Sequence, residues 1–190
     1  SVMSDAKMIA RYIRNCSDMG IEVLPPSVNK SLKKFSVEDG KIRFGLLGVK
    51  NVGENVIEAI LKAREEKGEP SDIFTFINNL DISQVNKRAI ESLIKAGACD
   101  CLEGNRAAKL AIYETLVESA QNTSKKNLEG QISLFQMASD AMSSAGTGKR
   151  LPDVQAFPLN IELAMEKEML GVYLTGHPLD AYKEKMERIG

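Results

Sequence analysis

Two glycine-bearing breaks between amphipathic segments constrain the fold of this chain most. The first break is Val49–Gly53, and the residues after it, 54–67, place apolar side chains at helical spacing. The second break contains Gly97 and separates a helical pattern at 86–95 from another that begins after Asn105, a residue type that favours helix N-caps. The breaks lie about forty-five residues apart. This arrangement predicts a mainly α-helical domain built from two related units, each of two helices joined by a tight turn.

Other segments share this helical periodicity. The spacing predicts a helix over residues 5–19, with Ser4 as its N-cap and Gly20 ending it at position C′. Further helices are expected to begin at residue 73, to cover 160–170 and to cover 180–189.

A short β-hairpin is expected between the first helix and the first break. Pro25 and Pro26 forbid a helix and force an extended connection. Residues 35–37 and 41–44 then alternate between apolar and polar side chains on either side of Asp39–Gly40. Because Asp-Gly favours a two-residue hairpin turn, the turn is expected at that pair.

Composition excludes several classes of protein. The chain has 190 residues, 25 Lys and Arg against 26 Asp and Glu, and a net charge of −1, so it is not a polycationic nucleic-acid coat. No apolar run approaches the roughly 18 residues of a membrane span. Residues 1–5 do not resemble the start of a signal peptide, and three cysteines do not suit a disulfide framework. We therefore expect a cytoplasmic protein without a membrane partner.

The first break has the features of a phosphate-binding turn. A tight turn that ends in glycine exposes backbone N–H groups at the start of the next helix, where the helix dipole is positive. Such groups bind phosphate oxygens, as in the helix-hairpin-helix motif, which holds duplex DNA by its backbone without reading bases. The candidate DNA-binding residues are Val49, Lys50, Asn51, Val52 and Gly53, with Lys41 and Arg43 of the hairpin as further cations. The alternative is an ordinary glycine-capped turn.

The second break repeats this arrangement less clearly. Its candidate phosphate ligands are Lys95, Gly97, Arg106 and Asn105. Asp100 and Glu103 would repel phosphate, which favours a mainly structural role for this half. Two turns at this interval nevertheless favour a tandem module that holds both strands of a duplex across one groove.

An apolar island interrupts a polar region near the C-terminal end. Residues 121–130 are polar and 138–150 are rich in Ala, Ser and Gly, a composition typical of a flexible linker. Between them lies the pentapeptide Gln131–Phe135, which has the form of the peptides that bind bacterial sliding clamps. In that form Gln131 would hydrogen-bond at the rim of a pocket on the clamp, while Leu134 and Phe135 would fill its apolar interior. The alternative is that Leu134 and Phe135 pack on the core of this domain.

The sequence contains no recognisable catalytic constellation. His177 is the sole histidine, and without it neither a Ser/His/Asp nor a Cys/His arrangement can be built. There is no P-loop and no G-x-G-x-x-G motif. Adjacent acids fall on expected solvated faces or in a turn, and no sheet gathers carboxylates for a two-metal site. No catalytic residue, metal ligand or cofactor is therefore assigned to this chain.

Several blocks of the sequence are similar, in the same order, to one protein family. The blocks are Cys16–Ser31, Ile42–Leu46, Val49–Gly53, Leu93–Asp100, Asn105–Ala107, Gly130–Phe135 and Glu168–Leu179. They resemble the family of bacterial DNA polymerase III alpha subunits, the C-family replicative polymerases. The resemblance extends over nearly the whole chain, although Cys99 and Cys101 depart from the residues expected there and leave the packing of the second break open.

The resemblance implies a part of a larger polymerase. It divides the chain into the end of the fingers region (1–35), a tandem helix-hairpin-helix domain for primer-template duplex (36–120), a flexible linker with the clamp-binding motif (121–155) and a helical connection toward an OB-fold (156–190). In the family the catalytic aspartates and Mg²⁺ lie in the palm, so DNA-directed DNA polymerase (nucleotidyltransferase) activity is implied for the parent protein and none for this chain. The implied partners are double-stranded DNA, the beta sliding clamp and the remainder of the polymerase holoenzyme.

Two other functions compete with this interpretation. A helix-hairpin-helix fragment of a DNA repair enzyme, a glycosylase or a nuclease, would need an acid or a lysine at a base-flipping pocket, and the sequence indicates none. A purely structural helical spacer would use Gly53 as a helix cap and bury Phe135 in its core.

Overall fold

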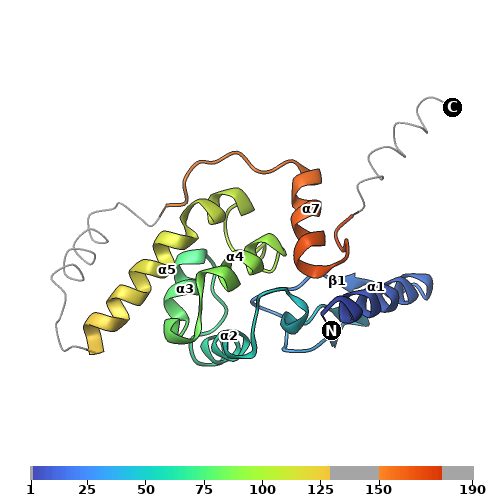
Figure 1. Ribbon diagram of the computed structural model, residues 1–190, viewed down its shortest axis with the longest axis horizontal. Helices are drawn as coiled ribbons and strands as arrows, with labels where there is room; N and C mark the ends of the chain where they lie inside the picture. The colour runs from blue at the N-terminus through green and yellow to red at the C-terminus, as the bar shows by residue number, and fades with distance from the viewer. Residues whose placement is uncertain (1, 129–149, 177–190) are drawn as a thin grey trace.

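The computed structural model describes residues 2–128 and 150–176, which form a mainly helical body with one small sheet (Figure 1). This confirms the expected fold class. The elements are α1 (Val2–Asp18), β1 (Val23–Leu24), β2 (Ser36–Glu38), β3 (Lys41–Arg43), the 3-10 turn η1 (Leu46–Gly48), α2 (Glu54–Lys67), α3 (Ile73–Asn79), the 3-10 turn η2 (Ile82–Gln84), α4 (Lys87–Lys95), α5 (Arg106–Leu128) and α7 (Leu159–Leu170).

The small sheet contains the expected hairpin and one additional strand. Strands β2 and β3 pair antiparallel around Asp39 and Gly40, whose φ angles of 50° and 77° fit the expected two-residue turn. Strand β1, which was not expected, pairs parallel with β3 and gives the order β1-β3-β2. It lies directly before Pro25, so the extended connection predicted from the two prolines begins with a strand.

The first helix ends as predicted but begins earlier. Gly20 has a φ of 72°, its N–H donates to the Ser17 carbonyl oxygen (3.0 Å), and the N–H of Ile21 donates to that of Cys16 (2.8 Å). This is the bond pattern of a glycine C′ residue. The expectation that Ser4 caps the N-terminus is wrong, because helix α1 already begins at Val2 and includes Ser4.

The remaining helices begin at side-chain caps in most cases. The side chains of Asp72, Asn86 and Asn105 accept hydrogen bonds from the N–H groups of Thr75, Ala89 and Ala108 respectively (2.7, 2.8 and 2.8 Å). Helix α2 has the predicted bounds, but its N-cap is Gly53, which has no side chain to offer. The start of α2 is therefore the helix terminus of greatest functional interest.

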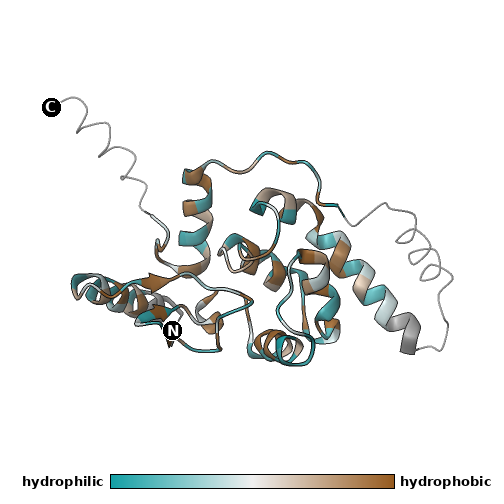
Figure 2. Cartoon of the chain, turned by 180° about the vertical axis from the view of Figure 1, so that it is seen from behind, coloured by the Kyte–Doolittle hydropathy of each residue, from teal (hydrophilic) through white to brown (hydrophobic). Residues whose placement is uncertain are grey.

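One apolar core joins these helices. Helices α2, α3 and α4 each turn one face inward, and α5 and α7 close over them. Figure 2 shows brown and teal residues on each of these helices, as expected for elements buried on one side. The largest fully buried apolar side chains are Phe44, Leu46, Ile57, Ile60, Ile73, Ile77, Ile90, Leu93, Ile94 and Leu163.

Helix α5 corrects the expected start of the linker. The linker was expected from residue 121, but α5 continues to Leu128 and extends away from the core (Figure 1). Residues 150–158 form an extended connection that returns to α7. The pentapeptide expected to bind a sliding clamp and the helix expected at 180–189 lie outside the described residues. Within residues 2–128 and 150–176, no helix is long and apolar enough to cross a membrane.

Candidate nucleic-acid interface

The first turn separates its anchoring residues from its exposed ones. The side chains of Val49 and Val52 are only 2% and 6% exposed and fix the turn to the core. Lys50 and Gly53 are exposed, and Asn51 is half-buried. Of the five candidate DNA-binding residues in this turn, the two valines are therefore anchors, whereas Lys50 and Gly53 lie at the surface.

The backbone N–H groups of this turn divide in the same way. The N–H of Lys50 donates to the Met169 carbonyl oxygen of α7 (2.9 Å), and that of Val52 donates to Val49 (3.2 Å). The first hydrogen bond inside α2 runs from Ile57 to the Gly53 carbonyl oxygen (3.1 Å). The N–H groups of residues 54–56 precede that bond, and groups at this position of a helix have no intrahelical acceptor. We call these three groups the amide row; Glu54 and Asn55 are exposed at the surface, and Val56 is buried.

Glycine at position 53 is not required by the fold. Its φ of −84° and ψ of 168° are accessible to any residue, and a Cβ atom there would meet nothing within 4 Å. By contrast, a Cβ at Gly48 would collide with the ring of Phe44. The missing side chain at residue 53 therefore leaves the amide row open to an approaching group and has no packing role.

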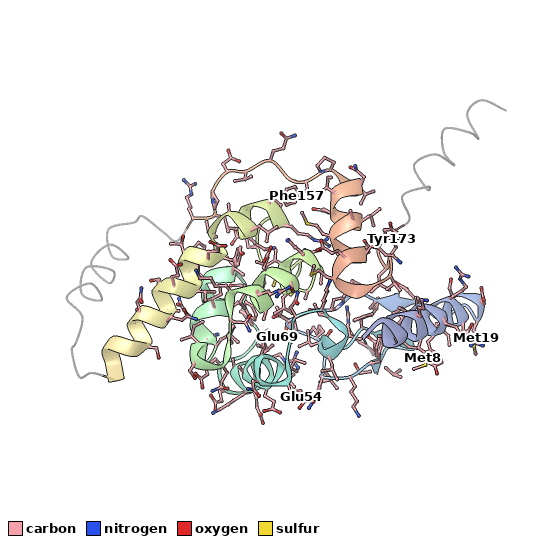
Figure 3. All side chains as sticks on the ribbon, viewed as in Figure 1. Met8, Met19, Glu54, Glu69, Phe157 and Tyr173 are labelled. Carbon is pink, nitrogen blue, oxygen red and sulfur yellow. The ribbon has the colours of Figure 1, made fainter. Side chains whose placement is uncertain are left out.

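One acidic residue lies beside the amide row. Glu54, the first residue of α2, is exposed at the surface (Figure 3) and pairs with Lys33 through a 2.9 Å contact. The carboxylate complements the positive end of the helix dipole, while Lys33 offsets its charge. Lys50 is the exposed cation within the turn itself.

Asn51 holds the turn in place through its side chain. It has a φ of 63°, a left-handed conformation that asparagine tolerates, and its Nδ2 donates to the Ser92 Oγ of α4 (3.0 Å). Ser92 is buried. The side chain of Asn51 is thus used inside the molecule, and its contribution to a DNA site is to shape the backbone.

The second turn is closed by internal contacts. Gly97 has a φ of 80°, and its N–H and that of Ala98 donate to the Ile94 and Leu93 carbonyl oxygens (3.1 and 2.9 Å). A Cβ at Gly97 would collide with the guanidinium of Arg106. Glycine is therefore needed here for both conformation and packing, unlike at residue 53.

Arg106 belongs to the core, contrary to its predicted role as a phosphate ligand. It is 5% exposed and forms a bidentate ion pair with Asp100, through Nε to Oδ1 (2.9 Å) and Nη2 to Oδ2 (2.6 Å). Burial lowers the pKa of Arg106, but the hydrogen bonds that it donates to the Asp100 carboxylate more than offset this and leave its pKa raised. Asn105 is also occupied, because its Nδ2 donates to the Val154 carbonyl oxygen (2.9 Å).

The other predicted cations are paired as well. Lys95, with a quarter of its side chain exposed, contacts Glu91 (2.5 Å). In the hairpin, Lys41 contacts Glu22 (2.6 Å) and Arg43 contacts Glu38 (2.8 Å). These ion pairs do not support the additional phosphate contacts expected from Lys41 and Arg43, and the side chain of Lys95 beside the second turn is likewise held by an internal contact.

Sequence reasoning missed a buried lysine beside the second turn. Lys109 of α5 is fully buried, and its Nζ donates to the carbonyl oxygens of Cys99, Leu102 and Gly104 (2.9, 2.8 and 2.6 Å). Burial lowers the pKa of this ammonium. Its position within the apolar run 107–112 was the available signal, because a lysine on an apolar helix face must find polar partners inside.

The cysteines resolve the packing question at the second turn. Cys99 is fully buried, and burial raises the pKa of its thiol, so it packs as a small apolar residue. Cys101 is exposed and donates to the Ala98 carbonyl oxygen (3.7 Å). The described residues contain no group of three His, Cys, Asp or Glu side chains placed to hold a metal ion.

Comparison with known proteins identifies what this chain is similar to. Residues 20–109, which include both turns, match the helix-hairpin-helix motif family. The chain is 38% identical over 98% of its length to the DNA polymerase III subunit alpha of Vibrio cholerae, and 42% identical over 94% to that of Thermus aquaticus. The match to the Mycobacterium tuberculosis subunit is 40% over 95%. The chain spans only 14–16% of the length of these relatives.

Proposed function

Because this chain belongs to the family of DNA polymerase III alpha subunits, as a segment of 14–16% of their length, we propose that it binds primer-template duplex DNA through backbone phosphates. The observation that carries the proposal is the amide row at the start of α2, in front of which Gly53 places no side chain. Lys50, three residues before Gly53, is an exposed cation in the same turn.

The amide row can bind phosphate oxygens, but it offers nothing that would recognise a particular base. Backbone N–H groups at a helix N-terminus bind an anion through hydrogen bonds and through the positive end of the dipole, so no excess of basic side chains is needed. A net charge of −1 is compatible with such a site. Binding should be independent of DNA sequence, weak for this segment alone and on the order of micromolar or worse.

We also propose that Gln131, Leu134 and Phe135 dock on the beta sliding clamp. The support is the form of the pentapeptide and its position, three residues after the end of α5. A clamp contact would make rebinding to DNA intramolecular and so raise the effective concentration of the duplex-binding surface. The rest of the polymerase holoenzyme is the remaining expected partner, in the cytoplasm.

Catalysis is assigned to the parent protein. The parent would be a DNA-directed DNA polymerase that uses Mg²⁺ in its palm, and this segment would add duplex binding and clamp attachment. We expect the purified segment to incorporate no nucleotide on a primed template. Incorporation that survives purification would contradict this assignment.

The substitution Gly53→Asp tests the duplex-binding proposal. An N-cap aspartate accepts hydrogen bonds from the same N–H groups and complements the helix dipole. The free energy of unfolding should therefore rise by about 0.5 to 1 kcal/mol. The aspartate also occupies the amide row and repels phosphate, so affinity for a duplex should fall by roughly tenfold or more. Fluorescence anisotropy with labelled duplexes of two unrelated sequences, over a range of salt concentrations, measures the affinity.

The matched control is Gln84→Glu, which makes the same charge change on the exposed turn η2. It should bind duplex DNA nearly as the unmodified chain does. If both variants lose affinity for duplex DNA equally, the change in net charge alone explains the loss, and occupation of the amide row does not. Affinity that depends on base sequence and not on salt would contradict the phosphate mechanism.

A further inference from the structure

Helix α7 contacts the first turn near its C-terminal end and, near its N-terminal end, Arg106, the α5 residue whose guanidinium lies against Gly97 of the second turn. The carbonyl oxygen of Met169, in its last turn, accepts the N–H of Lys50 (2.9 Å). The carbonyl oxygen of Glu162, in its first turn, accepts a longer bond from Nη1 of Arg106 (3.4 Å). Seven residues separate these acceptors, which places them about 10 Å apart along the helix axis. In Figure 1, α7 stands beside α4, against which it packs.

The C-terminal end of α7 is itself fixed by a buried carboxylate. Glu166 is fully buried, and its Oε2 accepts from the N–H groups of Leu174 and Thr175 (2.9 and 3.2 Å) and from the Thr175 hydroxyl (3.3 Å). Gly171 ends the helix with a φ of 78°. These contacts fold residues 172–175 back along α7 and hold its last turn, including the Met169 carbonyl, in place.

A second tie joins the two turns through α4. Asn51 in the first turn donates to Ser92 Oγ, and the Ser92 carbonyl oxygen accepts the N–H of Ala96 in the second turn (2.9 Å). The first turn is therefore held from two sides, by α4 through a side chain and by α7 through a backbone bond. Among the described residues, these bonds connect the first turn directly to α7 and to α4, and connect the second turn to them through Ser92 and Arg106.

From these contacts we propose that α7 is a positioning element of the duplex-binding surface. This inference rests on the proposed function. The N–H of Lys50 is committed to Met169 and is not a phosphate ligand. Its bond fixes the backbone that carries Gly53 and the amide row. Since N–H to phosphate bonds weaken steeply with distance and angle, a turn released from α7 would bind DNA less well without losing any contact group.

The substitution pair Lys50→Pro and Lys50→Ala isolates this bond. Both variants lose the ammonium, but only proline also loses the N–H that reaches Met169. Val49, with φ −83° and ψ 124°, is in the extended region that a following proline prefers. We expect Lys50→Pro to bind duplex DNA roughly fivefold to tenfold more weakly than Lys50→Ala, with the same salt slope, since one hydrogen bond and no charge distinguishes them.

A second pair tests the same inference from α7. Glu166→Ala removes the oxygen that accepts from the N–H groups of residues 174 and 175. Glu166→Gln keeps one side-chain carbonyl oxygen that can still accept these hydrogen bonds. We expect Glu166→Ala to lose affinity for duplex DNA several-fold and Glu166→Gln to retain most of it. Near-ultraviolet circular dichroism shows whether each variant is folded at the assay temperature.

The outcomes separate this inference from the proposed function. If the unmodified chain does not bind duplex DNA at any low salt concentration, the proposed function fails. If it binds, but Lys50→Pro equals Lys50→Ala or folded Glu166→Ala equals Glu166→Gln, the positioning role of α7 is overturned. Should Lys50→Pro fail to fold, the Glu166 pair decides the matter alone.

Discussion

Replacing Lys109 by Met is expected to lower the free energy of unfolding by about 3 kcal/mol, the largest stability effect that the described contacts predict. Methionine keeps most of the volume of the side chain but removes the donor of three hydrogen bonds, to the carbonyl oxygens of Cys99, Leu102 and Gly104. The Cys99 oxygen keeps the N–H of Leu102 (3.0 Å), whereas that of buried Leu102 loses the ammonium that it accepts from. Those carbonyls belong to the loop that follows α4, so the loss should loosen the second turn in particular.

Thermal unfolding followed by circular dichroism measures this effect. A change of this size corresponds to a drop in melting temperature of roughly 6 to 12 °C for a chain of this length. The control is Lys62→Met, which removes an exposed lysine of α2 with a side chain 71% exposed and should change stability by less than about 0.5 kcal/mol. Equal effects of the two substitutions would show that the carbonyl contacts of Lys109 contribute little.

The largest effect on binding is expected from replacing Leu134 and Phe135 together by alanine. In the proposed clamp complex these two side chains fill an apolar pocket, and such anchors dominate the energy of small interfaces. The double variant should therefore lose detectable binding to the beta sliding clamp while its melting temperature changes little. Surface plasmon resonance on immobilised clamp measures the first quantity, and thermal unfolding measures the second.

A matched control is available on α7. Leu159 and Ile161 are exposed by 64% and 39%, so replacing both by alanine also removes two exposed apolar side chains. That variant should keep its clamp binding. If the Leu134 and Phe135 variant instead loses several kcal/mol of stability, those residues pack on the core, and the structural-spacer interpretation gains support.

Local sequence signals predicted most of the fold. The Asp39–Gly40 turn, the end of α1 at Gly20 and the cap at Asn105 each depend on a few neighbouring residues, and each is confirmed. Strand β1 was missed because it has two residues and is defined by its partner β3, which is distant in sequence. The linker was expected too early because residues 121–128 are polar, although they contain no Gly or Pro to stop α5.

The candidate site was predicted less completely than the fold. The position of the amide row follows from a glycine placed just before a helix, and that is readable in the sequence. The role of a charged side chain depends on its neighbours in space. Arg106 was expected to face DNA but pairs with Asp100 inside the molecule, and Lys109 was overlooked although it holds three carbonyls. Sequence gives the number of charges but not their partners.

The unexpected length of α5 has a mechanical consequence. Its 23 residues span about 34 Å, and the proposed clamp peptide begins three residues beyond its end. In the proposed complex, the length of α5 would contribute to the distance between the DNA-binding surface and the clamp. One residue inserted into α5 would turn the end of the helix at Leu128 by about 100° around its axis and move it about 1.5 Å further along that axis. The direction in which α5 ends, as well as its length, would thus bear on where the clamp peptide starts.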